Sequence, residues 1–169
     1  MNTPIRLITS FVLVLSVIVS LNVSTASAKV SGKDVVGTWT LVSATMTKNG
    51  EHKDLFGSNP LGQVVFDEHG KYTLIMMRSD IPKFANNNRK KGTAAENEAV
   101  IHGSIAHFGS YTYNADDKTY TLHIKASTYP NWNNASQTRR LTVHGNDMLW
   151  DNPAGSTGGS LKILLKRVQ

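Results

Sequence analysis

The chain has 169 residues, enough for one domain, and no shift in composition marks a second domain. Its formal net charge is +6, but the basic residues are scattered and no track of stacking aromatic side chains accompanies them, which excludes a nucleic-acid-binding protein. The absence of cysteine excludes disulfides, thiolate metal sites and a cysteine nucleophile.

The N-terminal segment 1–28 is typical of a secretory signal peptide. Arg6 gives it a basic start, residues 7–21 are almost wholly apolar, and Ala-Ser-Ala at 26–28 matches a cleavage site. The alternative is an uncleaved membrane anchor, but the apolar run is shorter than the roughly 20 residues of a full span. We therefore expect an exported protein, periplasmic or secreted, whose mature domain covers 29–169 and keeps no membrane span.

The rest of the chain reads as short strands separated by turn residues. The first strand covers 35–46 and ends before an Asn-Gly pair, which tolerates the positive φ angles of a tight turn. Three hairpins follow, because runs rich in β-branched and aromatic residues flank turns at 67–70, 114–118 and 145–146. With a last strand over 160–168, the pattern predicts an all-β protein, an eight-stranded antiparallel up-and-down barrel.

One segment departs from the strand pattern, between the third and fourth strands. Thr93 and Glu96 form a capping box in front of good helix formers, which predicts a short helix up to about Ile105. Val100, Ile101 and Ile105 are placed to form one apolar stripe. We expect this helix to act as a lid across an opening of the barrel.

The first strand opens on Gly37, Thr38 and Trp39, a Gly-x-Trp triplet. This triplet resembles the start of the first strand in lipocalins, whose barrel architecture is of the calycin type. The resemblance implies that Gly37 and Trp39 are structural, with Trp39 closing the barrel floor. A basic residue of the last strand, Lys166 or Arg167, is expected to stack on the Trp39 ring.

Two long stretches resemble the bacterial and fungal lipocalin-like domain family. They read DLFGSNPLGQVVFDEHGKYTLIMMRSDIPKFA and HGSIAHFGSYTYNADDKTYTLHIKASTYPNWNNASQTRRL. The most specific pieces are GSNP, MRSDIPKF, FGSY, STYPNW and QTRR. The resemblance covers nearly all of the mature chain. It implies an eight-stranded lipocalin-like barrel with a short lid helix, and it implies no single reaction or ligand.

The strand around residues 72–78 has two faces, and the one that points inward determines the chemistry of the barrel interior. Alternate residues face opposite sides of a sheet, so Tyr72, Leu74 and Met76 share a face with Arg78. The opposite face, which starts at Thr73, is almost as apolar, and the pattern does not choose between them. Either lining gives an apolar site with few polar groups, as ligand sites usually have.

Arg139 shares its face with Leu141 and Val143, which predicts that it points inward. A charge inside an apolar barrel needs a partner, because its burial alone is costly. A ligand carboxylate is one such partner, since a guanidinium binds carboxylates through parallel hydrogen bonds. The alternative is an arginine at the rim that extends to water.

His107 and His123 are the candidate catalytic residues, as acid–base groups. His107 follows the predicted helix and is expected with Phe108 at the mouth of the barrel. Alternation puts His123 and Ser127 on one face, and that face either lines the cavity or meets water. The family resemblance favours the cavity, although Lys125 stands on the same face where the family favours an acid.

Three functions remain open from the sequence: a binding protein for a small hydrophobic molecule with or without a carboxylate, an isomerase-, cyclase- or hydratase-type enzyme, and an interaction module with a filled barrel. We predict neither a metal site nor a cofactor, and the sequence leaves the oligomeric state open. The predicted ligand-binding residues are Tyr72, Met76, Arg78, His107, Phe108, Tyr111, His123, Ser127, Trp132 and Arg139.

Overall fold

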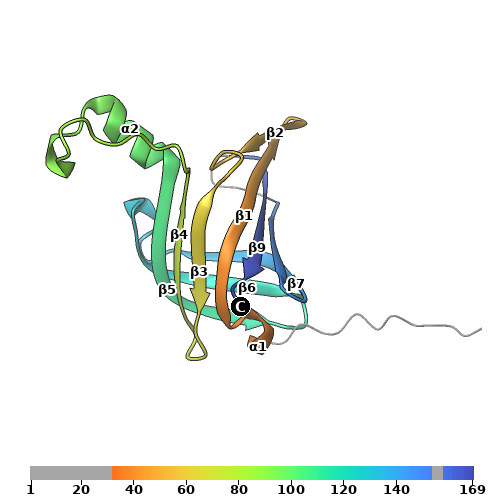
Figure 1. Cartoon of the computed structure of the whole chain (residues 1–169). Helices are drawn as coiled ribbons and strands as arrows, with labels where there is room; N and C mark the ends of the chain where they lie inside the picture. The colour runs from red at the N-terminus through yellow and green to blue at the C-terminus, as the bar shows by residue number, and fades with distance from the viewer. Residues whose placement is uncertain (1–31, 154–157) are drawn as a thin grey trace, which may run out of the picture.

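The computed structural model describes residues 32–153 and 158–169, so the predicted signal peptide at 1–28 lies outside the described residues. The described chain begins with one helical turn, α1 (Gly32–Val35), and nine strands follow (Figure 1). The strands are β1 (Gly37–Lys48), β2 (Glu51–Asp54), β3 (Leu61–Phe66), β4 (Lys71–Met77), β5 (Ser104–Asn114), β6 (Thr119–Ser127), β7 (Ser136–His144), β8 (Asp147–Asn152) and β9 (Ser160–Arg167).

The strands form one antiparallel sheet that closes on itself. Neighbours in the sheet follow chain order from β3 to β9, and β1 pairs with both β3 and β9. β2 pairs with the end of β1 alone, where Thr45 faces Asp54 and Lys48 faces Glu51. The wall of the barrel therefore consists of eight strands, β1 and β3 to β9, which confirms the predicted fold.

The core lies inside this barrel, because side chains alternate between its interior and its outer surface. On β4 the interior set is Tyr72, Leu74 and Met76, each at most 3 % exposed, whereas Ile75 between them is 41 % exposed. This settles the choice of face that the sequence leaves open. The same alternation buries Val64, Phe66, Tyr120, Leu122, Ile124, Leu141, Met148, Trp150, Ile163 and Leu165.

One end of the barrel is closed by the Gly-x-Trp triplet. The indole of Trp39 is fully buried and donates through Nε1 to the carbonyl of Val35 in α1 (2.9 Å). The guanidinium carbon of Arg167 lies 4.1 Å from the centre of the Trp39 ring, and its Nη1 donates to the carbonyl of Val36 (2.7 Å). Arg167 thus takes the role expected of a basic residue on the last strand. Gly37 is needed here, since its φ is +134° and a Cβ would lie 2.6 Å from Nη1 of Arg167.

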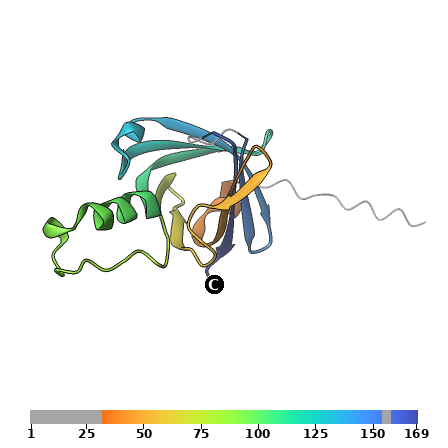
Figure 2. The ribbon, with the colours of Figure 1, turned by 90° about the horizontal axis from the view of Figure 1, so that it is seen from above.

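The predicted helix is α2 (Ala94–Gly103), and it lies between the third and fourth strands of the wall, as expected. Together with the turn η1 (Arg89–Lys91) it projects beside the open end and does not cross it (Figures 1 and 2). The predicted apolar stripe does not form, because Ile101 is 65 % exposed. The capping box is present, and Glu96 also accepts from the backbone N–H of Ala85 (2.8 Å), which ties the helix to its own loop.

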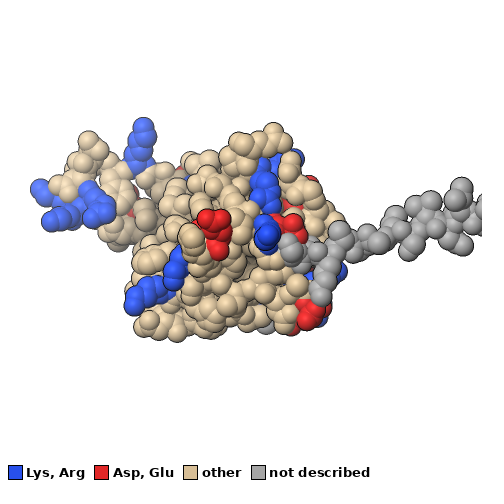
Figure 3. Space-filling model, turned by 90° about the horizontal axis from the view of Figure 1, so that it is seen from below, with Lys and Arg blue, Asp and Glu red and all other residues tan. Residues whose placement is uncertain are grey.

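Charge is distributed unevenly between this projecting segment and the barrel. Viewed from the closed end, Lys and Arg side chains gather on the projecting segment, whereas both signs are mixed over the barrel (Figure 3). The basic residues of η1 are Arg89, Lys90 and Lys91. A second short turn, η2 (Pro130–Trp132), connects β6 to β7 at the open end.

The register between β5 and β6 shifts in the middle of the pair. Gly109 pairs with Ile124 and Phe108 pairs with Ala126, so Lys125 is an extra residue and forms a β-bulge. Because directly paired residues share a face of the sheet, Ala126 follows the outward Phe108. The simple alternation that the sequence predicts for β6 therefore ends at this bulge.

Candidate functional site

Polar side chains gather on one part of the inner face of the barrel, and we call the following four the interior polar cluster: Tyr72, His107, Gln137 and Arg139. Tyr72 and His107 are buried at 3 % and 6 % exposure, and Gln137 and Arg139 are half-buried. Strand register places them there. Arg139 pairs with the fully buried Tyr120, and Gln137 lies two residues before Arg139 on the same face of β7.

Tyr72 and His107 form one unit within this cluster. Oη of Tyr72 and Nδ1 of His107 are 2.9 Å apart, and the two rings meet edge to face with centroids 5.5 Å apart. Burial, and to a smaller extent the positive charge of Arg139, together lower the pKa of His107 from 6.5 to about 4. Burial also raises the pKa of the Tyr72 hydroxyl. Both groups are consequently neutral at neutral pH.

Arg139 brings a positive charge into this neutral surrounding. Its Nη2 donates to Oε1 of Gln137 (2.7 Å) and its Nη1 donates to the carbonyl of Thr138 (3.0 Å). Both acceptors are uncharged, and none of the ion pairs found among the described residues includes Arg139. Burial lowers the pKa of its guanidinium, but arginine stays protonated in proteins. Its pairing with the buried Tyr120 places Arg139 on the inner face of β7, whereas its role as a ligand-binding residue stays a prediction.

Below the polar cluster, the closed half of the barrel is filled with aromatic rings. Phe66 lies at centroid distances of 4.8 Å from Tyr111, 6.3 Å from Tyr120 and 6.1 Å from Trp150. Tyr120 and Trp150 are themselves 5.0 Å apart. These aromatic side chains pack against one another in the closed half of the barrel.

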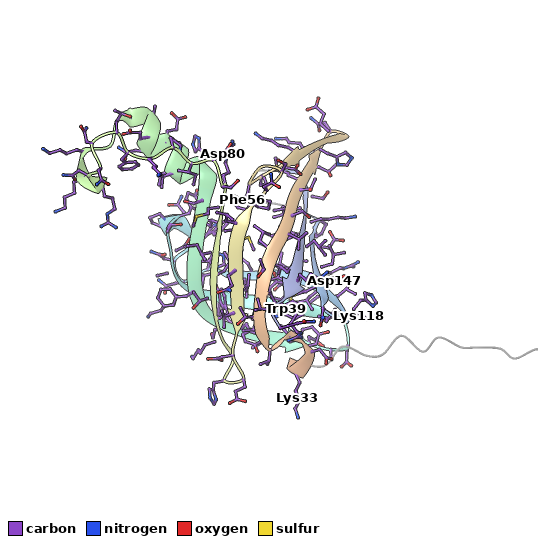
Figure 4. All side chains as sticks on the ribbon, in the orientation of Figure 1. Lys33, Trp39, Phe56, Asp80, Lys118 and Asp147 are labelled. Atoms are coloured by element: carbon purple, nitrogen blue, oxygen red, sulfur yellow. The ribbon has the colours of Figure 1, made fainter. Side chains whose placement is uncertain are left out.

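Toward the open end, the apolar residues around the core are only partly covered. This set of half-buried side chains, which we call the upper apolar ring, consists of Leu55, Phe56, Ile105, Trp132 and Leu161. Figure 4 shows Phe56 near the open end and Trp39 and Lys33 near the closed end. Trp132 lies above the polar cluster, with its ring centroid 5.8 Å from that of His107. The cluster therefore lies between a packed floor and an apolar entrance.

The structure divides the residues predicted to bind a ligand into groups. Tyr72, Met76, His107 and Arg139 lie inside the barrel, and Trp132 lies at its rim. Tyr111 also lies on the inner side, but its hydroxyl donates to the carbonyl of Asp67 (2.8 Å) in the hairpin of the closed end. Of the remaining predicted residues, Ser127 shares the inward face of His107, whereas Arg78, Phe108 and His123 lie elsewhere.

Ser127 and His123 do not share a face, contrary to the sequence pattern. The bulge at Lys125 shifts the alternation, so Ser127 pairs with the inward His107, whereas His123 before the bulge is exposed on the outer surface. Phe108 is also outside, at 50 % exposure. Placing His123 in the cavity is therefore wrong, and so is the use of Phe108 to close the mouth.

Arg78 lies near the open end, but its guanidinium faces a carboxylate of this chain. Its Nε and Nη2 each donate to an oxygen of Asp80 at 2.7 Å. This pairing raises the pKa of Arg78 through the hydrogen bonds and the charge of Asp80. The two residues also line a small hollow of about 250 Å³ next to α2. Arg78 is thus already paired, in contrast to Arg139.

Two neighbours of Arg139, Gln137 and Tyr120, are not among the residues predicted from the sequence. The signal for Gln137 was available, because alternation along QTRR puts Gln137 on the face of Arg139. Tyr120 is a cross-strand neighbour, and only the register between β6 and β7 reveals it. Among the described residues, no group of three or more His, Asp or Glu side chains is placed to hold a metal ion.

Comparisons with known proteins agree with this architecture. No curated protein matches the chain. No helix in the described ranges is both long and apolar enough to cross a membrane. A family model described as a lipocalin-like domain matches residues 36–160, which include the Gly-x-Trp triplet and every member of the interior polar cluster. This chain therefore belongs to the lipocalin-like domain family, and its barrel is consistent with the binding of a small molecule.

Proposed function

We propose that this protein binds a small apolar molecule that carries a carboxylate, with the carboxylate against Arg139. One observation carries the proposal: a half-buried guanidinium inside the barrel whose described partners are both neutral oxygens. Arginine has five N–H donors, and these two hydrogen bonds leave donors available. A carboxylate accepts two parallel hydrogen bonds from a guanidinium and compensates its buried charge.

The surroundings support an apolar body for this ligand. The upper apolar ring lies between the polar cluster and the open end, so a molecule with its carboxylate at Arg139 extends past these side chains. Burial of apolar ligand surface contributes about 25 cal/mol per Å² before the costs of association. Tyr72 and the neutral His107 add hydrogen-bonding groups without a second charge.

Isothermal titration with decanoate and 1-decanol tests the role of Arg139. We expect decanoate to bind the wild-type protein more tightly than the alcohol. Arg139→Gln should weaken decanoate binding about 10- to 100-fold, because hydrogen bonds to charged groups contribute about 1.5–3 kcal/mol. Alcohol binding should hardly change in this variant.

Arg140 provides the matched control, because it follows Arg139 and is exposed on the outer face of β7. Arg140→Gln removes the same charge from the protein and should leave decanoate affinity unchanged. Equal losses in the two variants would mean that the positive charge of the whole protein, not Arg139 itself, attracts the carboxylate.

An acid–base role for His107 is the second candidate function, and one observation favours it. A neutral imidazole, hydrogen-bonded to Tyr72, lies beside the positive charge of Arg139 inside the barrel. Such a pair can accept and return a proton during an isomerisation of a bound molecule. If the protein is an enzyme of this kind, His107→Gln should abolish turnover and retain ligand binding. If it is a binding protein, neither the wild type nor His107→Gln shows turnover.

We also infer that the protein is exported and that residues 1–28 are removed on the way. The inference rests on the basic start, apolar run and Ala-Ser-Ala site of this segment. Intact-mass measurement of the protein from the envelope or medium of an expressing bacterium should give a chain that begins at Lys29. A chain that retains Met1 would indicate an uncleaved anchor.

A further inference from the structure

A hollow of about 590 Å³ lies on the outer wall of the barrel, away from the interior polar cluster. It extends over β4, β5 and β6 to the start of β7, and its lining includes Lys71, Phe108, His123, Lys125 and Ser136. None of these residues belongs to the upper apolar ring or to the polar cluster. We call this feature the outer hollow.

Strand register explains why polar side chains meet there. Lys71 pairs with Ser110, Ser110 pairs with His123, and His123 pairs with Ser136. These residues form one row across four strands, and neighbouring strands lie about 4.8 Å apart. Their neighbours along each strand, such as Tyr72, face the core, so the row itself faces outward.

The bulge in β6 adds a further charge to this row. As the extra residue, Lys125 lies on the outer surface beside His123, and both are exposed. Gly109, opposite the bulge, lies so close to β6 that a Cβ would clash with the carbonyl of His123. The absence of a side chain at this position permits the close approach of the two strands. Phe108 stands at 50 % exposure next to it and forms an apolar side of the hollow.

The chemistry of the lining is that of an anion site. Two lysines contribute positive charge, and none of the described residues that line the hollow is acidic. His123 and Ser136 supply a hydrogen-bonding pair, with Nδ1 and Oγ 2.9 Å apart. Lysine binds phosphate as a point charge, and a phosphate monoester offers three acceptor oxygens and a charge of about −1.5 to −2 at pH 7.

We propose that the outer hollow is a second binding site, for a small soluble phosphate monoester with an apolar substituent. The phosphate lies between Lys71 and Lys125 and accepts a hydrogen bond from the group of the His123–Ser136 pair that keeps a free proton, Nε2 of His123 or Oγ of Ser136. The apolar substituent packs on Phe108. This site is separate from the proposed carboxylate site and does not depend on Arg139.

Backbone NMR titration of the protein with phenyl phosphate tests the proposal. We expect saturable shifts of the amide signals at 108–110, 123–125 and 134–136. Inorganic phosphate should bind more weakly than phenyl phosphate, because it makes no contact with Phe108. Phe108→Ala should reduce this difference.

The double variant Lys71→Ala/Lys125→Ala should weaken phenyl phosphate binding at least tenfold. Its matched control is Lys53→Ala/Lys162→Ala, which removes two exposed strand lysines outside the hollow. Arg139→Gln should leave this affinity unchanged, which separates the outcome from that of the carboxylate proposal. Non-saturable shifts, shifts spread over all basic residues, or equal loss in the control variant would each overturn the proposal.

Discussion

The charge inside the barrel is governed by two neighbouring residues, His107 and Arg139. Burial inside the barrel lowers the pKa of both side chains. The imidazole is held neutral, while the guanidinium keeps its charge without an acidic partner among the described residues. The two side chains differ in charge because the pKa of a free arginine lies about six units above that of a free histidine.

Burial of His107 makes the stability of the fold depend on pH. The pKa of His107 is about 4 in the folded protein and about 6.5 when unfolded. As pH falls from 7 to 5, the unfolded chain binds more protons than the folded one, so stability decreases. We expect this residue to account for roughly 1–2 kcal/mol of that loss, since each unit of pKa shift corresponds to about 1.4 kcal/mol.

Urea denaturation at pH 7 and pH 5 measures this effect. His107→Gln keeps a hydrogen-bonding partner for Tyr72 and should lose less stability between the two pH values than the wild type. His144→Gln removes an exposed histidine of β7 and should behave as the wild type does. An unchanged pH dependence in His107→Gln would show that other groups cause the loss.

Gly37 has a structural role that can be tested directly. Gly37→Ala combines an unfavourable φ of +134° with a contact of 2.6 Å to Nη1 of Arg167, and we expect it to destabilise the fold by roughly 1–3 kcal/mol. Gly32→Ala is the control, because a Cβ there meets no atom within 4 Å. Thermal unfolding of both variants gives the comparison, and equal melting temperatures would contradict the role of Gly37 in closing this end of the barrel.

Among the elements, those with a strong local signal were predictable from the sequence. The eight wall strands and the capped helix follow from alternation, turn residues and the Thr93–Glu96 pair. The bulge at Lys125 was not predicted, because no residue within β6 marks it and its position depends on how β5, with Gly109 opposite, pairs with β6. This one missing signal explains why His123 and Ser127 were assigned to one face.

The position of α2 relative to the open end of the barrel was also not predictable from the sequence. A capping box indicates where a helix begins, but it does not indicate which surface of the protein the helix packs against. Here Glu96 accepts hydrogen bonds from Thr93 and from Ala85 of the preceding loop, so the helix and loop form a unit of their own beside the barrel.

Disruption of the cap should therefore act locally. Thr93→Ala removes the side chain that accepts from Glu96 N, and we expect it to destabilise α2 by about 1 kcal/mol. Hydrogen exchange should quicken in 94–103, while the melting temperature of the barrel hardly changes. Thr93→Ser keeps the cap and should exchange as the wild type does. A large loss of barrel stability in Thr93→Ala would mean that α2 supports the wall.

The whole molecule is a barrel with two unlike halves. The closed half is packed with aromatic rings over Trp39, and the open half presents half-buried apolar side chains around Arg139, which has no acidic partner among the described residues. Alternation along β7 places Gln137 on the face of Arg139, whereas Tyr120 meets Arg139 only through the register of β6 and β7 and was not predictable. Fold and family alone leave the ligand open.

Native mass spectrometry of the protein, purified without denaturation, tests the central claim most directly. Wild type, Arg139→Gln and Arg140→Gln should be prepared in parallel from the same cells and then incubated with decanoate. We predict one bound carboxylate per chain in the wild type and in Arg140→Gln, and loss of that molecule from Arg139→Gln. Equal occupancy in all three proteins, or an empty wild-type barrel at saturating decanoate, would contradict the assignment of Arg139 as the carboxylate-binding residue.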